Sequence, residues 1–326
     1  MEKKSYAVVI RTLGNGGDKY RQLINSILNQ TILPDEIIVV IPEGYNPDYV
    51  SGKERIIYSE KGMVIQRAVG IQAATSDYIL VVDDDVAFNS NFIKDIFYEI
   101  ESTNADVIVP AEEMDINSCQ NLNGFLKSFA QNFKYVFIGQ RFIMLNRLYR
   151  VKFAATGTCS INLNIDKTRK YKTQSWTFQC FFMKTDKAKT VRIEDERWLE
   201  RVGYAIYDDQ VFAYKSLQQG DKAIYIPAIT YSHLDGGTGH ANAIDNVSRL
   251  KRKLYANTFN RTVFWNKFMY KQATVLRKIW LIIWYAYATF NTFILYLIYS
   301  LFRKGYNNVP FQVIKGAMDG FQFKNK

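Results

Sequence analysis

Three consecutive aspartates in this chain have the types and spacing of a metal site. Asp83, Asp84 and Asp85 directly follow the apolar run "YILVV". Side chains two residues apart on a strand point the same way, so Asp83 and Asp85 are expected to face one point beyond the strand end. Their oxygens suit Mg²⁺ or Mn²⁺, which would offset their repulsion and leave positions open for phosphate oxygens. The competing interpretation is an acidic turn in which Asp85 or Asn89 caps a following helix.

A second acidic pair, with a histidine, lies further along the chain. Asp208 and Asp209 open the helical pattern "YDDQVFAYKSLQQG", which would end at Gly220. The strand pattern "KAIYIPAITYSH" then ends at His233, and the other histidine of the chain is His240. The acids begin one helix and His233 ends the strand that follows it. This arrangement could bring the acids and the histidine to the same end of the sheet. Helix-opening acids can also serve only the helix dipole, and a lone histidine can be purely structural.

Alternating strands and helices would position these side chains. Apolar runs predict strands, and apolar positions at helical spacing predict helices. Asp18 is the candidate N-cap of the first helix. Short connections between such elements favour parallel strands, and ligands then bind outside the carboxyl ends of the strands, where Asp83 lies. The predicted strands are 6–12, 36–41, 54–58, 78–82, 105–110, 176–183 and 222–233, and the first two predicted helices are 18–30 and 63–74.

Composition narrows the class of protein. The chain has 326 residues, of which 48% are hydrophobic, enough for one large domain with or without an appendage. Its three cysteines, Cys119, Cys159 and Cys180, are too few and too far apart for a disulfide framework, which favours a reducing compartment. The apolar run "AVVI" near Met1 is too short for a signal peptide, so the N-terminus is expected in the cytoplasm.

The positive charge is confined to the last quarter of the chain. Residues 1–248 hold 28 Lys and Arg against 30 Asp and Glu, whereas residues 249–326 hold 14 against a single acid, Asp319. Such a tail can bind nucleic acid or an anionic membrane. The basic segment Phe125–Lys152 allows two interpretations, a solvated surface helix or a surface facing a membrane or an anionic acceptor.

The tail also contains 24 uncharged residues, Ile279–Phe302, between Arg277–Lys278 and Arg303–Lys304. This length and the many aromatic residues fit a membrane-spanning helix. Basic residues at both ends weaken a simple spanning orientation and suit a re-entrant or in-plane helical pair at least as well. A buried helix, or a hairpin packed on the main domain, is the third interpretation. The long uncharged run argues against nucleic acid as the partner.

Five segments occur in an order that resembles a known family. They are "VVIRT", "LINSILNQTILPDEIIVV", "KGMVIQRAVGIQAATSDYILVVDDD", "YDDQVFAYKSLQQGDKAIYIPAITYSH" and "NRTVFWNK". Together they resemble a family 2 glycosyltransferase with a GT-A fold, which transfers a sugar from a nucleotide-sugar with inversion. The resemblance covers roughly residues 6–250. It implies an α/β GT-A domain at 1–248, with a mixed sheet flanked by helices, followed by a helical, membrane-associating region at 249–326.

The resemblance also assigns roles to individual acids. Asp83 would lie near the ribose or the metal, and Asp85 would bind the Mg²⁺ or Mn²⁺ that bridges the donor diphosphate, with Asp84 as a helper. Asp209 matches the catalytic base, and Asp208 stands where glutamate is commoner.

Further positions are carried over from the same resemblance. His233 matches a histidine that in some members ligates the metal or the donor phosphate. Trp176 matches an aromatic residue beside the transferred sugar, although a core tryptophan is an equal alternative. Gln66 and Arg67 match the segment near the nucleotide base.

Two segments depart from the family pattern and leave the nucleotide open. The first strand ends in "RTLG", so that Arg11 and Thr12 are expected to contact the donor. The second strand ends in "VVIPEG", where Glu43 would replace the usual acids. The Gln-x-x-Arg-Trp motif of processive synthases does not occur, which favours a non-processive enzyme.

The resemblance therefore implies a metal-dependent, inverting transfer from a UDP-, GDP- or dTDP-sugar to a glycan or lipid-linked acceptor. Cell-surface polysaccharide biosynthesis at the cytoplasmic face of the cell membrane is the expected setting. Two other classes stay open, a nucleotidyltransferase or sugar-phosphate pyrophosphorylase and a non-catalytic membrane-bound domain. "LGNGGDKYR" resembles the phosphate loop of the former only faintly.

Overall fold

The computed structural model describes residues 4–113, 133, 136–137, 148–162, 165–203, 206–234, 246–303 and 305–324. Most of the predicted basic segment Phe125–Lys152 lies outside these residues, as does His240.

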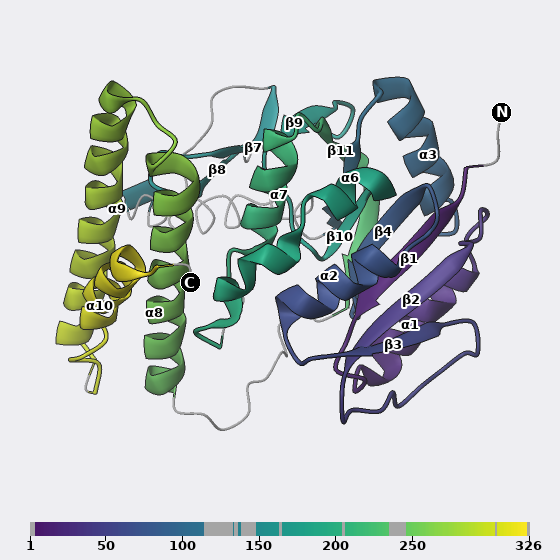
Figure 1. Ribbon diagram of the computed structural model, residues 1–326, viewed down its shortest axis with the longest axis horizontal. Helices are drawn as coiled ribbons and strands as arrows, with labels where there is room; N and C mark the ends of the chain where they lie inside the picture. Colours follow the sequence, from purple (N-terminus) through teal and green to yellow (C-terminus); the bar gives the residue numbers. More distant parts are fainter. Residues whose placement is uncertain are drawn as a thin grey trace.

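One mixed sheet runs through the molecule (Figure 1). Within the described residues its strands follow the order β3-β2-β1-β4-β10-β6-β11-β9-β7-β8, and β5 pairs with β11. The first four strands are parallel, whereas β10 runs antiparallel to both β4 and β6. The strands are β1 (Tyr6–Arg11), β2 (Glu36–Pro42), β3 (Arg55–Ser59), β4 (Tyr78–Asp83), β5 (Val86–Phe88), β6 (Val107–Glu112), β7 (Tyr149–Phe153), β8 (Cys159–Ile161), β9 (Tyr171–Thr173), β10 (Cys180–Lys184) and β11 (Ala223–His233).

Helices cover both faces of this sheet because its central strands are apolar on both sides. Along β1, Val8 and Ile10 join the core cluster that includes α1 and α3, whereas Ala7 and Val9 join the cluster that includes α2 and α7. Gly70 lets α2 approach closely, since a Cβ there would lie 2.5 Å from Cγ1 of Val9. The helices are α1 (Gly17–Leu28), α2 (Met63–Ala73), α3 (Phe92–Thr103), α6 (Thr185–Thr190), the 3-10 helix η1 (Ile193–Glu200), α7 (Asp208–Gln218), α8 (Asn246–Phe264), the π-helical η2 (Trp265–Tyr270), α9 (Val275–Leu301) and α10 (Phe311–Gln322).

Two details of the sequence prediction were wrong. The strand predicted at 176–183 begins only at Cys180, because its partner β4 ends at Asp83, whose N–H already donates to the carbonyl of Gln179. Asp18 does not cap the first helix. That helix begins at Gly17, so Asp18 lies in its first turn.

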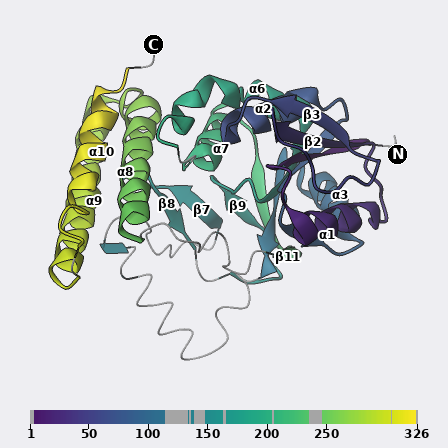
Figure 2. The same cartoon turned by 90° about the horizontal axis from the view of Figure 1, so that it is seen from below.

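The three C-terminal helices stand beside the sheet and away from β1–β3 (Figures 1 and 2). Phe259 and Phe264 of α8 nevertheless belong to the same core cluster as the sheet. Gly316 and Gly320 allow α10 to pack against the backbone of α8, since a Cβ at Gly320 would lie 3.0 Å from the carbonyl oxygen of Phe259. The C-terminal helices therefore pack against the sheet through α8 and share its hydrophobic core.

Candidate active site

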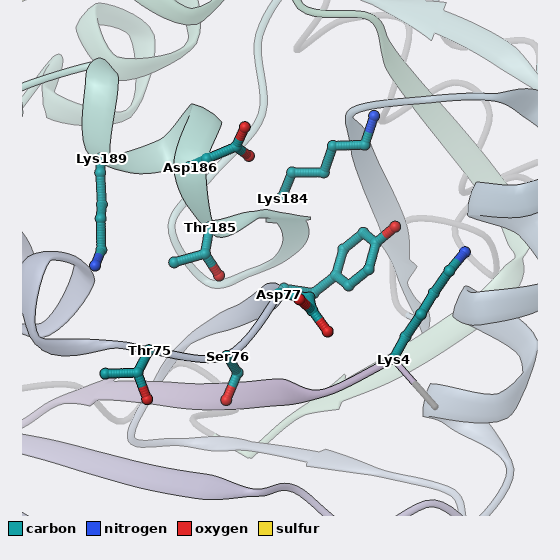
Figure 3. Close-up of a pocket in the computed structure, with 9 residues that line it drawn as sticks. Lys4, Thr75, Ser76, Asp77, Lys184, Thr185, Asp186 and Lys189 are labelled. Carbon is teal, nitrogen blue, oxygen red and sulfur yellow. The ribbon is translucent and has the colours of Figure 1, made fainter. Parts of the chain in front are cut away.

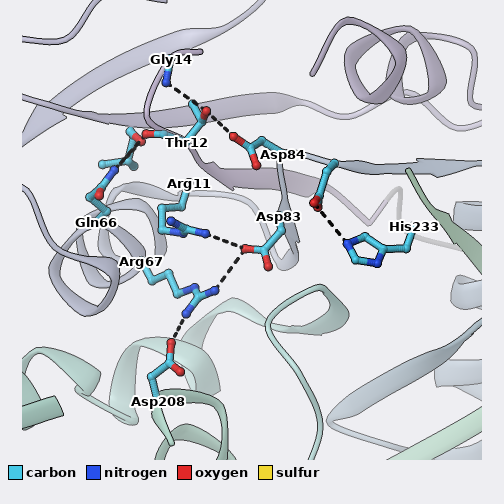
Figure 4. A network of polar contacts seen from close by, with 11 residues as sticks. Arg11, Thr12, Gly14, Gln66, Arg67, Asp83, Asp84, Asp208 and His233 are labelled. Atoms are coloured by element: carbon cyan, nitrogen blue, oxygen red, sulfur yellow. Dashed lines mark hydrogen bonds and ion pairs between the residues drawn. The ribbon is translucent and has the colours of Figure 1, made fainter. Parts of the chain in front are cut away.

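The carboxyl ends of β1 and β4 bring the first charged pair together (Figure 4). The two parallel strands pair so that Arg11 lies opposite Asp83. Nη2 of Arg11 donates to Oδ1 of Asp83 over 3.3 Å. Glu43 follows the end of β2 at this edge of the sheet, where it is exposed. Arg11, Asp83 and Glu43 thus lie at the carboxyl ends of neighbouring strands.

Arg67 connects this edge to the acidic pair of α7. Its side chain is only 5% exposed, and its Nη2 donates to Oδ1 of Asp83 over 3.1 Å while its Nη1 donates to Asp208. The guanidinium also stacks over the ring of Phe178 at 4.1 Å. Burial opposes the charge of Asp83, but Arg67 and Arg11 outweigh burial and hold the pKa of Asp83 below its usual value. The result is a continuous chain Arg11–Asp83–Arg67–Asp208.

Two neighbours of this chain hold the strand ends in place. The side-chain amide of Gln66 donates to the carbonyl oxygens of Thr12 and Val40, each over 3.1 Å, which ties β1 to β2. The hydroxyl of Thr12 donates to Oδ2 of Asp84. Burial raises the pKa of Asp84. Gln66 and Asp84 are therefore turned toward the protein's own backbone and hydroxyl groups.

Asp209 stands beside Asp208 at the start of α7. The helix is entered through Tyr207, a buried residue with φ +82°, a left-handed conformation that is costly for a tyrosine and directs the chain into the helix. Burial, with the neighbouring carboxylate of Asp208, raises the pKa of Asp209 to about 7. Burial also raises the pKa of Asp208, against the opposing effect of Arg67. A carboxylate with a pKa near neutrality is suited to accept a proton.

Asp85 meets His233 on the other side of Asp84. Nε2 of His233 lies 3.2 Å from Oδ2 of Asp85, and its Nδ1 lies 3.5 Å from Oε1 of Glu112. β11 brings the histidine there, because His233 pairs with Val86 on β5. A carboxylate and an imidazole that converge at a partly exposed edge are suitable first ligands for a divalent cation. They supply two ligands, since the described residues contain no group of three or more acidic, histidine or cysteine side chains arranged to hold a metal.

Two predicted residues have surroundings that differ from their predicted roles. Trp176 is 5% exposed and packs against Phe181 and Phe212, as the core alternative expects, although its indole N–H has no hydrogen-bond partner among the residues that the structure describes. Asp83, predicted to share the metal with Asp85, forms ion pairs with Arg11 and Arg67.

Other residues of the site were missed at the sequence level. Glu112 was missed because the predicted strand stopped at Pro110, whereas β6 continues for two further residues. The sequence feature that could have indicated Glu112 is the position of an acid two residues after a predicted strand. Tyr207 gave no signal, because only the tertiary structure imposes its left-handed conformation.

A separate hollow of about 840 Å³ lies at the opposite end of β4 (Figure 3). Tyr78 begins β4 and lines this hollow, whereas Asp83 ends the strand. The side chains of Lys4, Lys184 and Lys189 surround it. None of the predicted site residues lines this hollow.

Comparisons with known proteins agree with this fold. Residues 8–166 match the family model described as Glycosyl transferase family 2. The structure of TarS residues 1–349 from S. aureus aligns over 98% of this chain and 80% of TarS, with a TM-score of 0.52 and 16% identity. No curated protein matches the chain.

Two other solved structures align less well. GalNAc-T7, solved with UDP, GalNAc and Mn²⁺, has a TM-score of 0.46 and 14% identity over 91% of this chain, which spans 57% of the length of GalNAc-T7. The mannosyltransferase PcManGT from Pyrobaculum calidifontis, solved with GDP-Man and Mn²⁺, has a TM-score of 0.46 and 12% identity over 99% of this chain and 89% of PcManGT.

Proposed function

From the premise that this chain belongs to glycosyl transferase family 2 and is a glycosyltransferase with a GT-A fold, we propose that it inverts the anomeric centre of a nucleotide-sugar in a metal-dependent transfer to an acceptor hydroxyl. One observation carries the proposal. Asp209, a carboxyl group with a pKa of about 7, directly follows Asp208, the last member of the Arg11–Asp83–Arg67–Asp208 chain of ion pairs. Asp85 follows Asp84 directly after the end of β4, and its carboxylate lies 3.2 Å from Nε2 of His233.

Asp209 is the general base of this proposal. An inverting transfer needs in-line attack by the acceptor hydroxyl on the anomeric carbon while a carboxylate takes the hydroxyl proton. With a pKa of about 7, Asp209 is half ionised at neutral pH and still basic enough to accept that proton. Arg67 keeps Asp208 in place beside it and links both to the donor side through Asp83.

Asp85 and His233 are the residues that would hold Mg²⁺ or Mn²⁺. When bound, the cation would stabilise the negative charge that the leaving diphosphate gathers. His233 is kept in position by Glu112 on its other ring nitrogen, an arrangement that commonly orients histidine ligands. Asp83 is proposed as a donor-side residue whose charge is balanced by arginines.

The donor is proposed to be a UDP-, GDP- or dTDP-sugar that lies along the edge formed by Arg11, Thr12 and Glu43. Trp176 stays a proposed neighbour of the sugar through its indole N–H, for which the described part of the chain offers no hydrogen-bond partner. We propose a glycan or lipid-linked acceptor, non-processive transfer, and a site of action at the cytoplasmic face of the cell membrane in cell-surface polysaccharide biosynthesis.

The test is a panel of UDP-, GDP- and dTDP-sugars screened for binding by saturation-transfer NMR in the presence of Mg²⁺. We expect one nucleotide to bind, and its affinity to fall when Mg²⁺ is chelated or when Asp85 is replaced by Ala. Binding that is unaffected by chelation and by Asp85→Ala would refute the metal site. Failure of every nucleotide-sugar to bind would refute the proposed donor class.

A further inference from the structure

The outward faces of α9 and α10 expose many large apolar side chains. The chain exposes large side chains there that a water-soluble surface would normally cover. On α9, Leu276 is 81% exposed, Ile283 57% and Phe290 63%, and on α10 Met318 is 56% exposed. α9 is also long and apolar enough to cross a membrane by length and composition.

A groove of about 710 Å³ continues this apolar face between α9 and α10. Phe290 of α9 and Met318 of α10 line it and are also part of the exposed face. Trp265 and Tyr285 form part of its lining, and of its thirteen lining residues only Asn266 and Thr289 are neither apolar nor aromatic. The groove therefore opens onto the same surface and shares its chemistry.

Basic side chains frame the apolar face at both ends. Arg277 and Lys278 lie in the first turn of α9, and Arg303 lies two residues after its last residue, Leu301. Lys278 lies over the ring of Tyr270 at 5.4 Å, and Arg303 over the ring of Tyr299 at 4.6 Å. Cations beside tyrosine rings, at the border of an apolar surface, match the anionic headgroups and the interfacial layer of a bilayer.

Three side chains in the middle of α9, those of Tyr285, Thr289 and Phe293, contact α8. The hydroxyl groups of Thr262 and Tyr285 are 2.6 Å apart, and Nη2 of Arg261 donates to Thr289 over 2.7 Å. Further along, Phe293 of α9 packs in the cluster around Leu254 of α8. The two helices run side by side in both overall views (Figures 1 and 2).

This attachment conflicts with α9 as a spanning helix. The half of α8 beside the end of α9 carries the charged residues Arg249, Lys251, Arg252 and Lys253. A spanning α9 would either bring these charges toward the hydrocarbon core or break away from α8, and both are unfavourable. An α9 that lies in the membrane plane keeps its contacts with α8 and leaves those charges on the aqueous side.

We propose that α9 and α10 form a monotopic membrane-binding face that lies in one leaflet of an anionic phospholipid bilayer, with a hydrocarbon chain of that leaflet entering the groove between them. The proposal deepens the membrane association proposed above and does not depend on glycosyl transfer. Its tests measure membrane binding and orientation, so that they succeed or fail independently of the enzyme assay.

The first test is flotation of the full-length protein with vesicles of phosphatidylcholine, with and without phosphatidylglycerol. We expect binding that phosphatidylglycerol strengthens and that salt weakens. Ile283→Glu and Phe290→Glu should each reduce binding at least about tenfold, because each places a charge where an apolar side chain meets the bilayer. Tyr98→Glu is the matched control, since Tyr98 is 69% exposed on α3, far from α9 in Figure 1, and its replacement should leave binding unchanged.

The second test distinguishes an in-plane helix from a spanning one. Gln272→Cys and Asn308→Cys place thiols at exposed positions before and after α9. The protein is added to sealed vesicles and treated from outside with a maleimide that cannot cross the bilayer, with the labelling of the parent chain subtracted. We expect both cysteines to react.

Three results would overturn the proposal. Protection of one cysteine until detergent is added would show that α9 spans the bilayer. Equal binding by Ile283→Glu, Phe290→Glu and Tyr98→Glu would show that this face does not contact lipid. No vesicle binding, together with a dimer that Ile283→Glu dissociates, would make a second copy of the chain the partner of this face.

Discussion

Asp209 is an aspartate whose surroundings give it the properties of a base. Its position at the start of a helix would by itself lower its pKa. Burial and Asp208 instead raise the pKa to about 7, while Arg67 is already paired with Asp208 and Asp83. The proposed base and its neighbour therefore differ in their surroundings, with Asp208 paired to an arginine and Asp209 without that ion pair in the described structure.

We expect Asp209→Asn to reduce glycosyl transfer by about two to four orders of magnitude, the usual contribution of a general base. Donor affinity should change little, because the arginine chain does not include Asp209. The measurements are product formation under saturating donor and donor affinity by calorimetry. Asp18→Asn is the control, since Asp18 also lies in the first turn of a helix but is exposed. An equal loss of donor affinity would assign Asp209 to donor binding.

The rate of transfer should depend on pH through the same carboxylate. Because the pKa of Asp209 is raised to about 7, the base is protonated below that pH and the rate should fall about tenfold for each unit of further acidification. An ordinary aspartate would keep its full rate down to about pH 4. The measurement is kcat/KM between about pH 5 and pH 9 in the wild type. A flat profile down to pH 5 would contradict the assignment.

The raised pKa of Asp209 also makes the free energy of unfolding depend on pH. The dependence is opposite to that of an ion-paired carboxylate, whose pKa is usually lowered. The folded protein binds the proton of Asp209 more tightly than the unfolded chain does, so this contribution to stability is present at low pH and is lost as pH rises through about 7. At pH 8, Asp209→Asn should therefore raise the melting temperature of the protein while it strongly reduces transfer. A melting temperature that falls at pH 8 would indicate that Asp209 is structural.

At the scale of elements, the first turn of α2 is capped by Glu200, an acid that lies 136 residues further along the chain than Val64. The carboxylate of Glu200, at the end of η1, accepts hydrogen bonds from the N–H groups of Val64 and Ile65, over 2.7 and 3.2 Å. It therefore caps the helix that carries Arg67 into the active site. Arg197 lies between Glu200 and Glu60 and pairs with both.

We expect Glu200→Ala to lower the free energy of unfolding by about 1–2 kcal/mol, the usual cost of a lost N-cap. Donor affinity should also weaken, since the first turn of α2 leads directly to Arg67. Glu60→Ala is the matched control, because Glu60 pairs with the same arginine, whereas the N–H groups of Val64 and Ile65 donate to Glu200. Urea unfolding and donor titration measure the two effects, and equal behaviour of the two variants would show that the cap does not position the site.

At the scale of the whole molecule, a buried glutamate joins the C-terminal helices to the catalytic region. The carboxylate of Glu196, 4% exposed, contacts Lys267 of η2 at 2.6 Å and Lys215 of α7 at 3.2 Å. Burial opposes the charge of Glu196, but its hydrogen bonds and the two lysines lower its pKa. Removing one lysine would leave a buried carboxylate only partly compensated.

Lys267→Met should therefore lower the free energy of unfolding by about 2–4 kcal/mol. Lys271→Met, an exposed lysine four residues further on, should change it by less than about 0.5 kcal/mol. We also expect one cooperative unfolding transition, because Phe259 and Phe264 share a core cluster with the sheet. Two separate transitions in circular dichroism would show that α8–α10 form an independent unit.

The sequence by itself determined the order of the elements around the proposed site. Alternating apolar runs and acids after strands place Asp83 at the carboxyl edge of a sheet, since a strand's direction decides where its end lies. The same pattern predicted α7 with Asp208 and Asp209 in its first turn. These are local properties, which spacing along the chain encodes.

Only the tertiary structure decided which of these groups meet. Arg67 joins Asp83 to Asp208, and Glu200 caps α2 from 136 residues away, because strand pairing and helix packing bring distant segments into contact. The pKa of Asp209 depends on burial, and burial is a property of all the surrounding elements together. The exposed face of α9 likewise follows from how α8 packs against it, which an apolar run alone does not specify.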